Sequence, residues 1–156
     1  MKTEIGVSPE NLTAVAHELN CILADEFVLY TKTRDAHWNV EGPDFHSMHL
    51  FFEKQYNQLE EVIDEVAERI RMLGHYAPAT LAQYLELTHL TEESREKNNS
   101  TGFMRTLLNA HETIIIHLRG NVDRFAELGD AGTSDFITGL IETHEKMAWM
   151  LRAHLK

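Results

Sequence analysis

Apolar residues recur at spacings of three and four in four long segments of the chain, which is the pattern of amphipathic α-helices. In the first segment a capping serine precedes a proline at Ser8-Pro9-Glu10, and this helix is expected to end near His37-Trp38-Asn39. The second helix is expected to start at Gly42-Pro43-Asp44 and to run to about Leu73, with Gly74 as its stop.

The second half of the chain predicts two more long helices. One carries apolar residues from Phe103 to Phe125 and stops at Gly129. A turn from Gly129 to Ser134 follows, and the last helix carries apolar residues from Phe136 to Leu151.

A looser connection, from His75 to about Asn99, separates the second and third long helices. It contains Pro78 and room for one short helix near Leu81–Leu85. No convincing strand alternation is present. Four long helices with one long crossover predict an all-α, ferritin-like four-helix bundle rather than a simple up-down-up-down bundle. The length of 156 residues predicts one such domain, residues 1–156.

Composition narrows the class of partner. The chain has 14 Lys and Arg against 25 Asp and Glu, a net charge of −11, which disfavours binding to phosphate backbones. No apolar run approaches the roughly 20 residues of a membrane span, and the N-terminus lacks a signal-peptide pattern. The single cysteine, Cys21, excludes an intrachain disulfide and favours a cytoplasmic location.

One histidine and four carboxylates form a stripe on the second predicted helix. At 100° per residue they fall within about 100° of the helix circumference, beside its apolar face. Stripes of this kind are often a solvated surface or a set of ion pairs, and the residues alone leave that alternative open. The stripe consists of His49, Glu53, Glu60, Asp64 and Glu68.

The spacing within this stripe predicts ligands shared between two chains. His49 and Asp64 are 15 residues apart, about 22 Å along an α-helix, so one ion cannot bind both in one chain. The midpoint of positions 49 and 68 coincides with that of positions 53 and 64. An antiparallel copy of the helix across a two-fold axis near Gln58-Leu59 would therefore bring His49 opposite Glu68 of the copy, and Glu53 opposite its Asp64. Imidazole with carboxylates suits iron or manganese, and zinc less specifically; His37 is a plausible additional ligand.

The same residues lie in a pattern that resembles the Dps family, the miniferritins. The pattern is His37-Trp38-Asn39-Val40-x-Gly42, then Phe45, His49 and Asp64-x-x-Ala67-Glu68-Arg69-Ile70. The resemblance covers the whole chain in length and helix order. It implies a hollow homododecamer with ferroxidase sites shared across each two-fold interface.

The resemblance assigns individual residues. His37 and His49 match the ligands of one subunit, and Asp64 and Glu68 match those of its partner. The chain departs from the family at Glu53, where Asp is common, so one ligand arm is longer. Trp38 matches a tryptophan that takes up oxidising equivalents, although a core aromatic is also expected at such a position. Asp135 and Glu145, with Glu142 nearby, match acidic pore residues for iron entry; a solvated helix face is the alternative.

The resemblance implies a ferroxidase that oxidises Fe(II), with hydrogen peroxide preferred to oxygen, and stores ferric oxide as protection against oxidative stress. Zinc is a possible substitute metal. DNA binding is expected to be weak or absent, because only Lys2 precedes the first helix and the chain ends soon after the last helix, at Lys156.

Two alternatives remain at this stage. One is a nucleoid-associated or structural Dps-like shell with a vestigial or zinc-filled site, and the other is a monomeric bundle that binds a small molecule. An intrachain di-iron centre is disfavoured, because the chain's one Glu-x-x-His spacing, Glu86-x-x-His89, falls in the long connection. Histidines outside the motif are expected to be surface residues or satisfied core residues.

Overall fold

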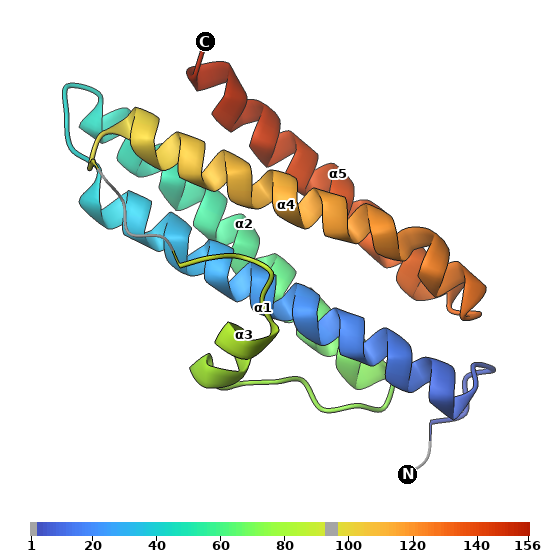
Figure 1. Cartoon of the computed structure of the whole chain (residues 1–156). Helices are drawn as coiled ribbons and strands as arrows, with labels where there is room; N and C mark the ends of the chain where they lie inside the picture. The colour runs from blue at the N-terminus through green and yellow to red at the C-terminus, as the bar shows by residue number, and fades with distance from the viewer. Residues whose placement is uncertain (1–2, 93–96) are drawn as a thin grey trace.

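The computed structural model describes residues 3–92 and 97–156, so the tail residue Lys2 lies outside the described part of the chain. In this described part, the chain forms four long helices and one short helix (Figure 1). The all-α, ferritin-like class predicted from the sequence is confirmed, including the short helix in the long connection. The helices are α1 (Pro9–Asn39), α2 (Phe45–Met72), α3 (Leu81–Leu87), α4 (Ser100–Glu127) and α5 (Ala131–His154).

Side-chain caps mark the starts of α1, α3, α4 and α5, whereas Asp44 before α2 makes no such hydrogen bond. Ser8 Oγ accepts a hydrogen bond from the Asn11 N–H at 3.2 Å, as the Ser-Pro pattern predicts. One boundary differs from the prediction: α5 begins at Ala131, so the turn after Gly129 is shorter than expected. The reason is Asp130, whose carboxylate accepts the Thr133 N–H at 2.9 Å and caps the helix at that point.

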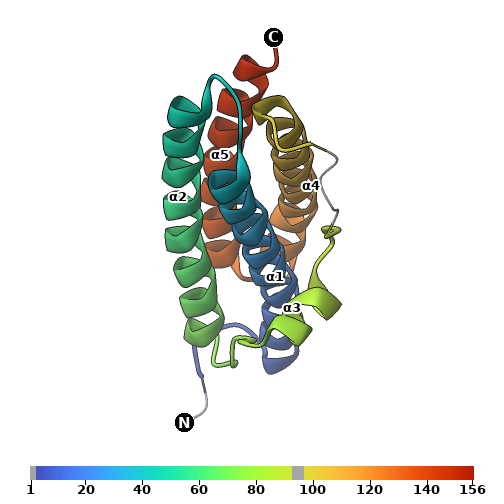
Figure 2. The same ribbon diagram turned by 90° about the vertical axis from the view of Figure 1, so that its left-hand side faces the viewer.

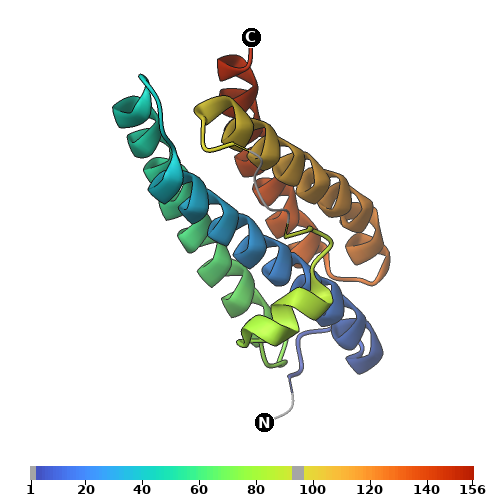
Figure 3. The same cartoon turned by 60° about the vertical axis from the view of Figure 1, so that its left-hand side comes forward.

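The helices pack as two hairpins, α1 with α2 and α4 with α5, with α4 against α1 and α5 against α2. The crossover runs along the outside of α1, and α3 lies against α1 (Figures 2 and 3). The apolar faces of the four long helices meet in a continuous core. Large side chains from all four of these helices are fully buried there, among them Leu19, Phe52, Leu59, Phe125 and Ile137.

The crossover is fastened to α1 by one buried carboxylate. Asp25 accepts hydrogen bonds from Thr88 Oγ1 at 2.7 Å, from the His89 N–H at 2.6 Å and from His89 Nδ1 at 2.9 Å. Phe27 also stacks on Tyr84, with ring centroids 4.2 Å apart. Burial raises the pKa of Tyr84, whose hydroxyl donates to the Pro78 carbonyl at 2.9 Å. These contacts hold α3 and the segment after it against α1.

Within residues 3–92 and 97–156, the only β-type pairing is a single bridge between Glu41 and Asn99. It ties the far end of the crossover to the turn between α1 and α2. None of the described helices is both long enough and apolar enough to cross a membrane.

Candidate metal centre

The predicted ligands His37 and His49 lie together at one end of the α1–α2 hairpin. His37 is in the last turn of α1, and His49 is one turn into α2. Their rings stack with centroids 3.7 Å apart and an interplanar angle of 22°. The sequence predicted that both residues belong to one site, and the structure places them in contact.

Two reciprocal hydrogen bonds set the orientation of these rings. His37 Nδ1 bonds to the carbonyl of His49 at 2.8 Å, and His49 Nδ1 bonds to the carbonyl of His37, also at 2.8 Å. A carbonyl oxygen can only accept, so each Nδ1 carries the hydrogen. In the neutral imidazole each Nε2 then keeps its lone pair. A backbone carbonyl at one ring nitrogen, with the other nitrogen free, is the arrangement found for metal-binding histidines.

Glu53 lies one turn further along α2 and is half-buried beside this pair. Tyr56 contacts Glu53 and His37. Its hydroxyl donates to Glu53 Oε1 at 3.4 Å, and its ring lies edge-on to that of His37 with ring centroids 5.1 Å apart. Burial, reinforced by the charge of Glu53, raises the pKa of Tyr56, so the phenol stays protonated and remains a donor. The Arg34 guanidinium lies 4.2 Å from the centre of the Tyr56 ring.

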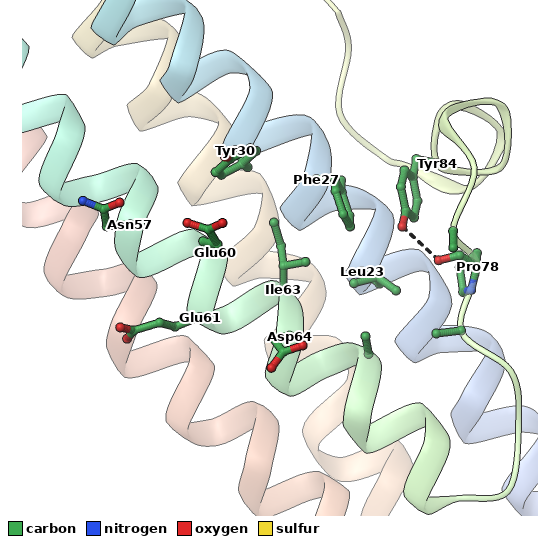
Figure 4. Close-up of a pocket in the computed structure, with 13 residues that line it drawn as sticks. Leu23, Phe27, Tyr30, Asn57, Glu60, Glu61, Ile63, Asp64, Pro78 and Tyr84 are labelled. Atoms are coloured by element: carbon green, nitrogen blue, oxygen red, sulfur yellow. Dashed lines mark hydrogen bonds between the residues drawn. The ribbon is translucent and has the colours of Figure 1, made fainter.

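The other two predicted ligands, Asp64 and Glu68, are exposed on the far half of α2. Asp64 lines a groove of about 880 Å³ between α1, α2 and α3, together with Glu60 and Glu61 (Figure 4). The opposite wall of this groove is apolar and includes Phe27 and Tyr84, with Leu23 and Pro78 beside them. The stripe is therefore divided into a half-buried part near the histidines and an exposed part in an open groove.

A single described chain does not assemble the whole ligand set. Among residues 3–92 and 97–156, no three His, Cys, Asp or Glu side chains converge on a possible metal position. At the level of Gln58 and Leu59, Leu59 is fully buried, while Asn57, Glu60 and Glu61 are exposed. A second copy placed on the predicted two-fold axis would consequently meet an open surface of α2.

Trp38 does not belong to the core of the chain. Its side chain is 63% exposed, so the core-aromatic interpretation of the sequence is wrong for the single chain. The Arg34 guanidinium lies 5.1 Å from its ring centre. Since His37 is the preceding residue, Trp38 is on the surface next to the histidine pair.

Two of the three predicted pore residues come together. Glu142 and Glu145 line a shallow depression between α4 and α5 that also contains Arg119 and Asp123. Glu145 forms an ion pair with Arg119. Asp135 is exposed near the start of α5 and does not line this depression.

Sequence reasoning missed a buried polar cluster made by Glu26, His111 and His144, all three with no exposed side-chain surface. His144 Nε2 bonds to Glu26 Oε1 at 2.8 Å, and His144 Nδ1 bonds to His111 Nδ1 at 2.9 Å. Among the described residues, nothing hydrogen-bonds to Glu26 Oε2 or His111 Nε2. Burial, and the neighbouring His144, hold the pKa of His111 well below its usual value.

The signal for this cluster was present but not used. Each member occupies an apolar position of the helical repeat on its own helix, for example His111 between Leu107 and Ile114. A titratable residue at such a position requires a buried partner. Spacing along one helix cannot find that partner, because it lies on another helix.

Residues 16–156 match the ferritin-like domain family. A protein from Bacillus anthracis named DNA protection during starvation protein 2 is 36% identical over 141 residues, which cover 90% of this chain and 96% of that protein. The chain belongs to the Dps family of ferritin-like proteins. A low temperature-induced protein of Nostoc sp. is 42% identical over 156 residues, covering 99% of this chain and 87% of that protein.

Solved structures agree with this membership. The Dps protein of Vibrio cholerae O1 is 32% identical, covers 99% of this chain and 97% of its own, and superposes with a TM-score of 0.93. It is described as a member of a broad superfamily of ferritin-like diiron-carboxylate proteins. The family resemblance inferred from the His37 to Ile70 pattern is thereby confirmed.

Proposed function

We propose that this chain is a Dps-type ferroxidase and iron store, in which iron is the substrate and the cargo. The observation that carries the proposal is the stacked pair of His37 and His49, each with Nδ1 on a backbone carbonyl and with no hydrogen bond to Nε2 from the described residues. Membership in the Dps family and the similarity to a diiron-carboxylate protein support iron as the metal.

The proposed site is completed by a second copy of the chain. His37, His49 and Glu53 would come from one subunit, and Asp64 and Glu68 from its partner across the two-fold axis. The half-buried histidine end and the exposed carboxylate end of α2 favour this division. The family resemblance extends the pair to a homododecameric shell, whose cavity would hold ferric oxide.

Each group then has a separate task. Neutral imidazoles bind Fe(II), and carboxylates balance the charge that rises when iron is oxidised. Hydrogen peroxide takes one electron from each of two Fe(II) ions and, with two protons, leaves as two molecules of water. We infer that peroxide is preferred to oxygen, that pairwise oxidation protects against oxidative stress, and that Trp38, exposed beside the pair, takes up stray oxidising equivalents.

Charge and ligand type indicate how the protein would interact with incoming Fe(II), with zinc and with DNA. Glu142 and Glu145, with Asp135, are proposed to attract Fe(II) to the pores. Zinc is proposed to compete for the imidazoles. A net charge of −11 per chain opposes contact with DNA phosphates, so DNA binding is proposed to be weak or absent.

The proposal is tested by stopped-flow measurement of Fe(II) oxidation by peroxide, comparing the unmodified protein with the double variant His37→Ala/His49→Ala. Fast oxidation should be lost while size-exclusion chromatography still shows an intact shell. His75→Ala, a histidine outside the site, is the control and should oxidise iron normally. An unchanged initial rate in the double variant would refute the site.

A zinc-filled or vestigial shell is distinguished in the same assay. Protein purified without chelator is analysed for metal, and iron is then added with peroxide before chromatography. Iron that elutes with the shell supports the ferroxidase. An intact shell that elutes without iron contradicts it.

A further inference from the structure

A second pair of stacked histidines lies on the outside of the helical hairpins, remote in sequence from the candidate metal centre. His89 follows α3, and His117 is in α4. Their ring centroids are 3.9 Å apart and their planes meet at 18°. These values are close to the 3.7 Å and 22° of His37 and His49. In both pairs, side chains from two different elements present imidazole rings face to face.

The tautomer of His89 is set by a buried carboxylate. Its Nδ1 lies 2.9 Å from Oδ2 of Asp25, a side chain that is 1% exposed. A carboxylate is an acceptor, so Nδ1 carries the hydrogen and the neutral ring keeps its lone pair on Nε2. Carboxylate-to-histidine contacts of this kind orient the ligands of metal sites and raise their basicity.

The pair is accessible to ions from solvent. The His89 side chain is 37% exposed, and His117 is half-buried beneath it. Within the described part of the chain, the His117 ring stacks on His89 and makes no hydrogen bond. One nearby cation opposes metal binding: Lys32 lines a small pocket together with His89, and its ammonium lies 2.8 Å from the Thr91 carbonyl.

We propose that His89 and His117 form a surface site for one divalent transition ion of borderline softness, such as Zn²⁺. A pair of imidazoles, with no carboxylate that binds the ion directly, suits such ions better than it suits Fe(II). Each lone pair lies in the plane of its ring, so a shared ion requires the stack to open. Such binding requires the His89 ring to tilt toward solvent, where its side chain is partly exposed, while Nδ1 stays on Asp25.

An ion bound by His89 and His117 would cross-link two parts of the fold. His89 belongs to the crossover and His117 to α4, so a bound ion would join the crossover to the α4–α5 hairpin. It would also place a positive charge near the buried carboxylate of Asp25. Zinc should therefore stabilise the folded chain through this site, because it binds the folded state and not the unfolded state.

The test is equilibrium dialysis of the whole protein against Zn²⁺, with bound zinc per chain measured by mass spectrometry. The variants are His117→Ala and the more conservative His117→Gln. The matched control is His17→Ala, which removes an exposed histidine of α1. Both His117 variants should bind one zinc ion fewer per chain than the unmodified protein, and the control should lose none.

Two results overturn the proposal: equal zinc in all four proteins, or an equal loss in His17→Ala, which would indicate unspecific binding to surface histidines. In the unmodified protein, Zn²⁺ should also protect His89 and His117, but not His17, from acylation by diethyl pyrocarbonate. Iron oxidation should be unchanged in the His117 variants. The zinc site and the proposed ferroxidase can thus fail independently.

Discussion

The buried contact between Glu26 and His144 gives the sharpest prediction for stability. Both side chains are fully buried and are joined at 2.8 Å. Replacing Glu26 with Leu keeps the approximate volume but leaves a polar ring without its acceptor. Breaking a buried pair in this way costs about 3–5 kcal/mol. For a chain of this length each kcal/mol shifts the melting temperature by about 2–4 °C, so Glu26→Leu should lower it by about 6–20 °C.

The matched control is Glu18→Leu on the same helix. Glu18 pairs with Arg124 at the surface, where both side chains keep access to water. Such pairs contribute about 0–1 kcal/mol, so the control should melt within a few degrees of the unmodified protein. Unfolding is followed by circular dichroism at a fixed protein concentration, because assembly shifts the apparent stability.

A triple variant, Glu26→Leu/His111→Leu/His144→Leu, tests whether the stability lost in Glu26→Leu comes from the unpaired buried histidines. It removes every polar member of the cluster, so no buried group is left without a partner, and most of the lost stability should return. A Glu26→Leu variant that melts like Glu18→Leu would refute the reasoning. So would a triple variant less stable than Glu26→Leu.

Two further predictions concern pH and one interhelical contact. The depressed pKa of His111 means that the unfolded chain gains a proton below about pH 6.5 that the folded chain does not bind, so stability should fall on acidification below that pH, by up to about 1.4 kcal/mol per pH unit. The slope of melting temperature against pH should flatten in His111→Leu. An unchanged slope would mean that another group causes the loss of stability in acid. Arg69 bonds Thr133 at 2.9 Å and Asp130 at 3.0 Å, so Arg69→Ala should cost about 1–3 kcal/mol in thermal unfolding. Arg71→Ala on the same helix loses an exposed contact to the His75 carbonyl and a contact with the exposed Tyr76 ring, and should cost far less.

Much of the fold was contained in local patterns. The Ser8-Pro9 start of α1 and the short helix after Pro78 follow from capping and helical period, and both are present. The composition of residues 129–134 predicts a turn up to Ser134, but the Asp130 cap starts α5 at Ala131. The exposure of Trp38 could not be predicted either, because the burial of a hydrophobic side chain at the end of a helix depends on how the next element packs.

The site was predictable only in part. The spacing of acids and His49 along α2 indicated ligands too far apart for one ion, and the exposed positions of Asp64 and Glu68 agree with that division. The reciprocal bonds between His37 and His49 could not be read from the sequence. They depend on how the turn between α1 and α2 brings two backbone carbonyls against two rings.

The central claim, that each site is shared by two chains, is tested most directly by mixing two inactive variants. One carries His37→Ala/His49→Ala, and the other carries Asp64→Asn/Glu68→Gln. In a mixed pair one site receives all of its native ligands, and the other receives neither set. Random pairing of equal amounts makes about half of the pairs mixed, so hybrid shells should recover about a quarter of the native rate of iron oxidation.

The hybrid shells are formed by co-expression with two different affinity tags, isolated over both tags in turn, and assayed beside shells of each variant alone. The account predicts negligible oxidation for each variant alone and about a quarter of the native rate for a random mixture. Hybrid shells as inactive as either parent would contradict the shared site.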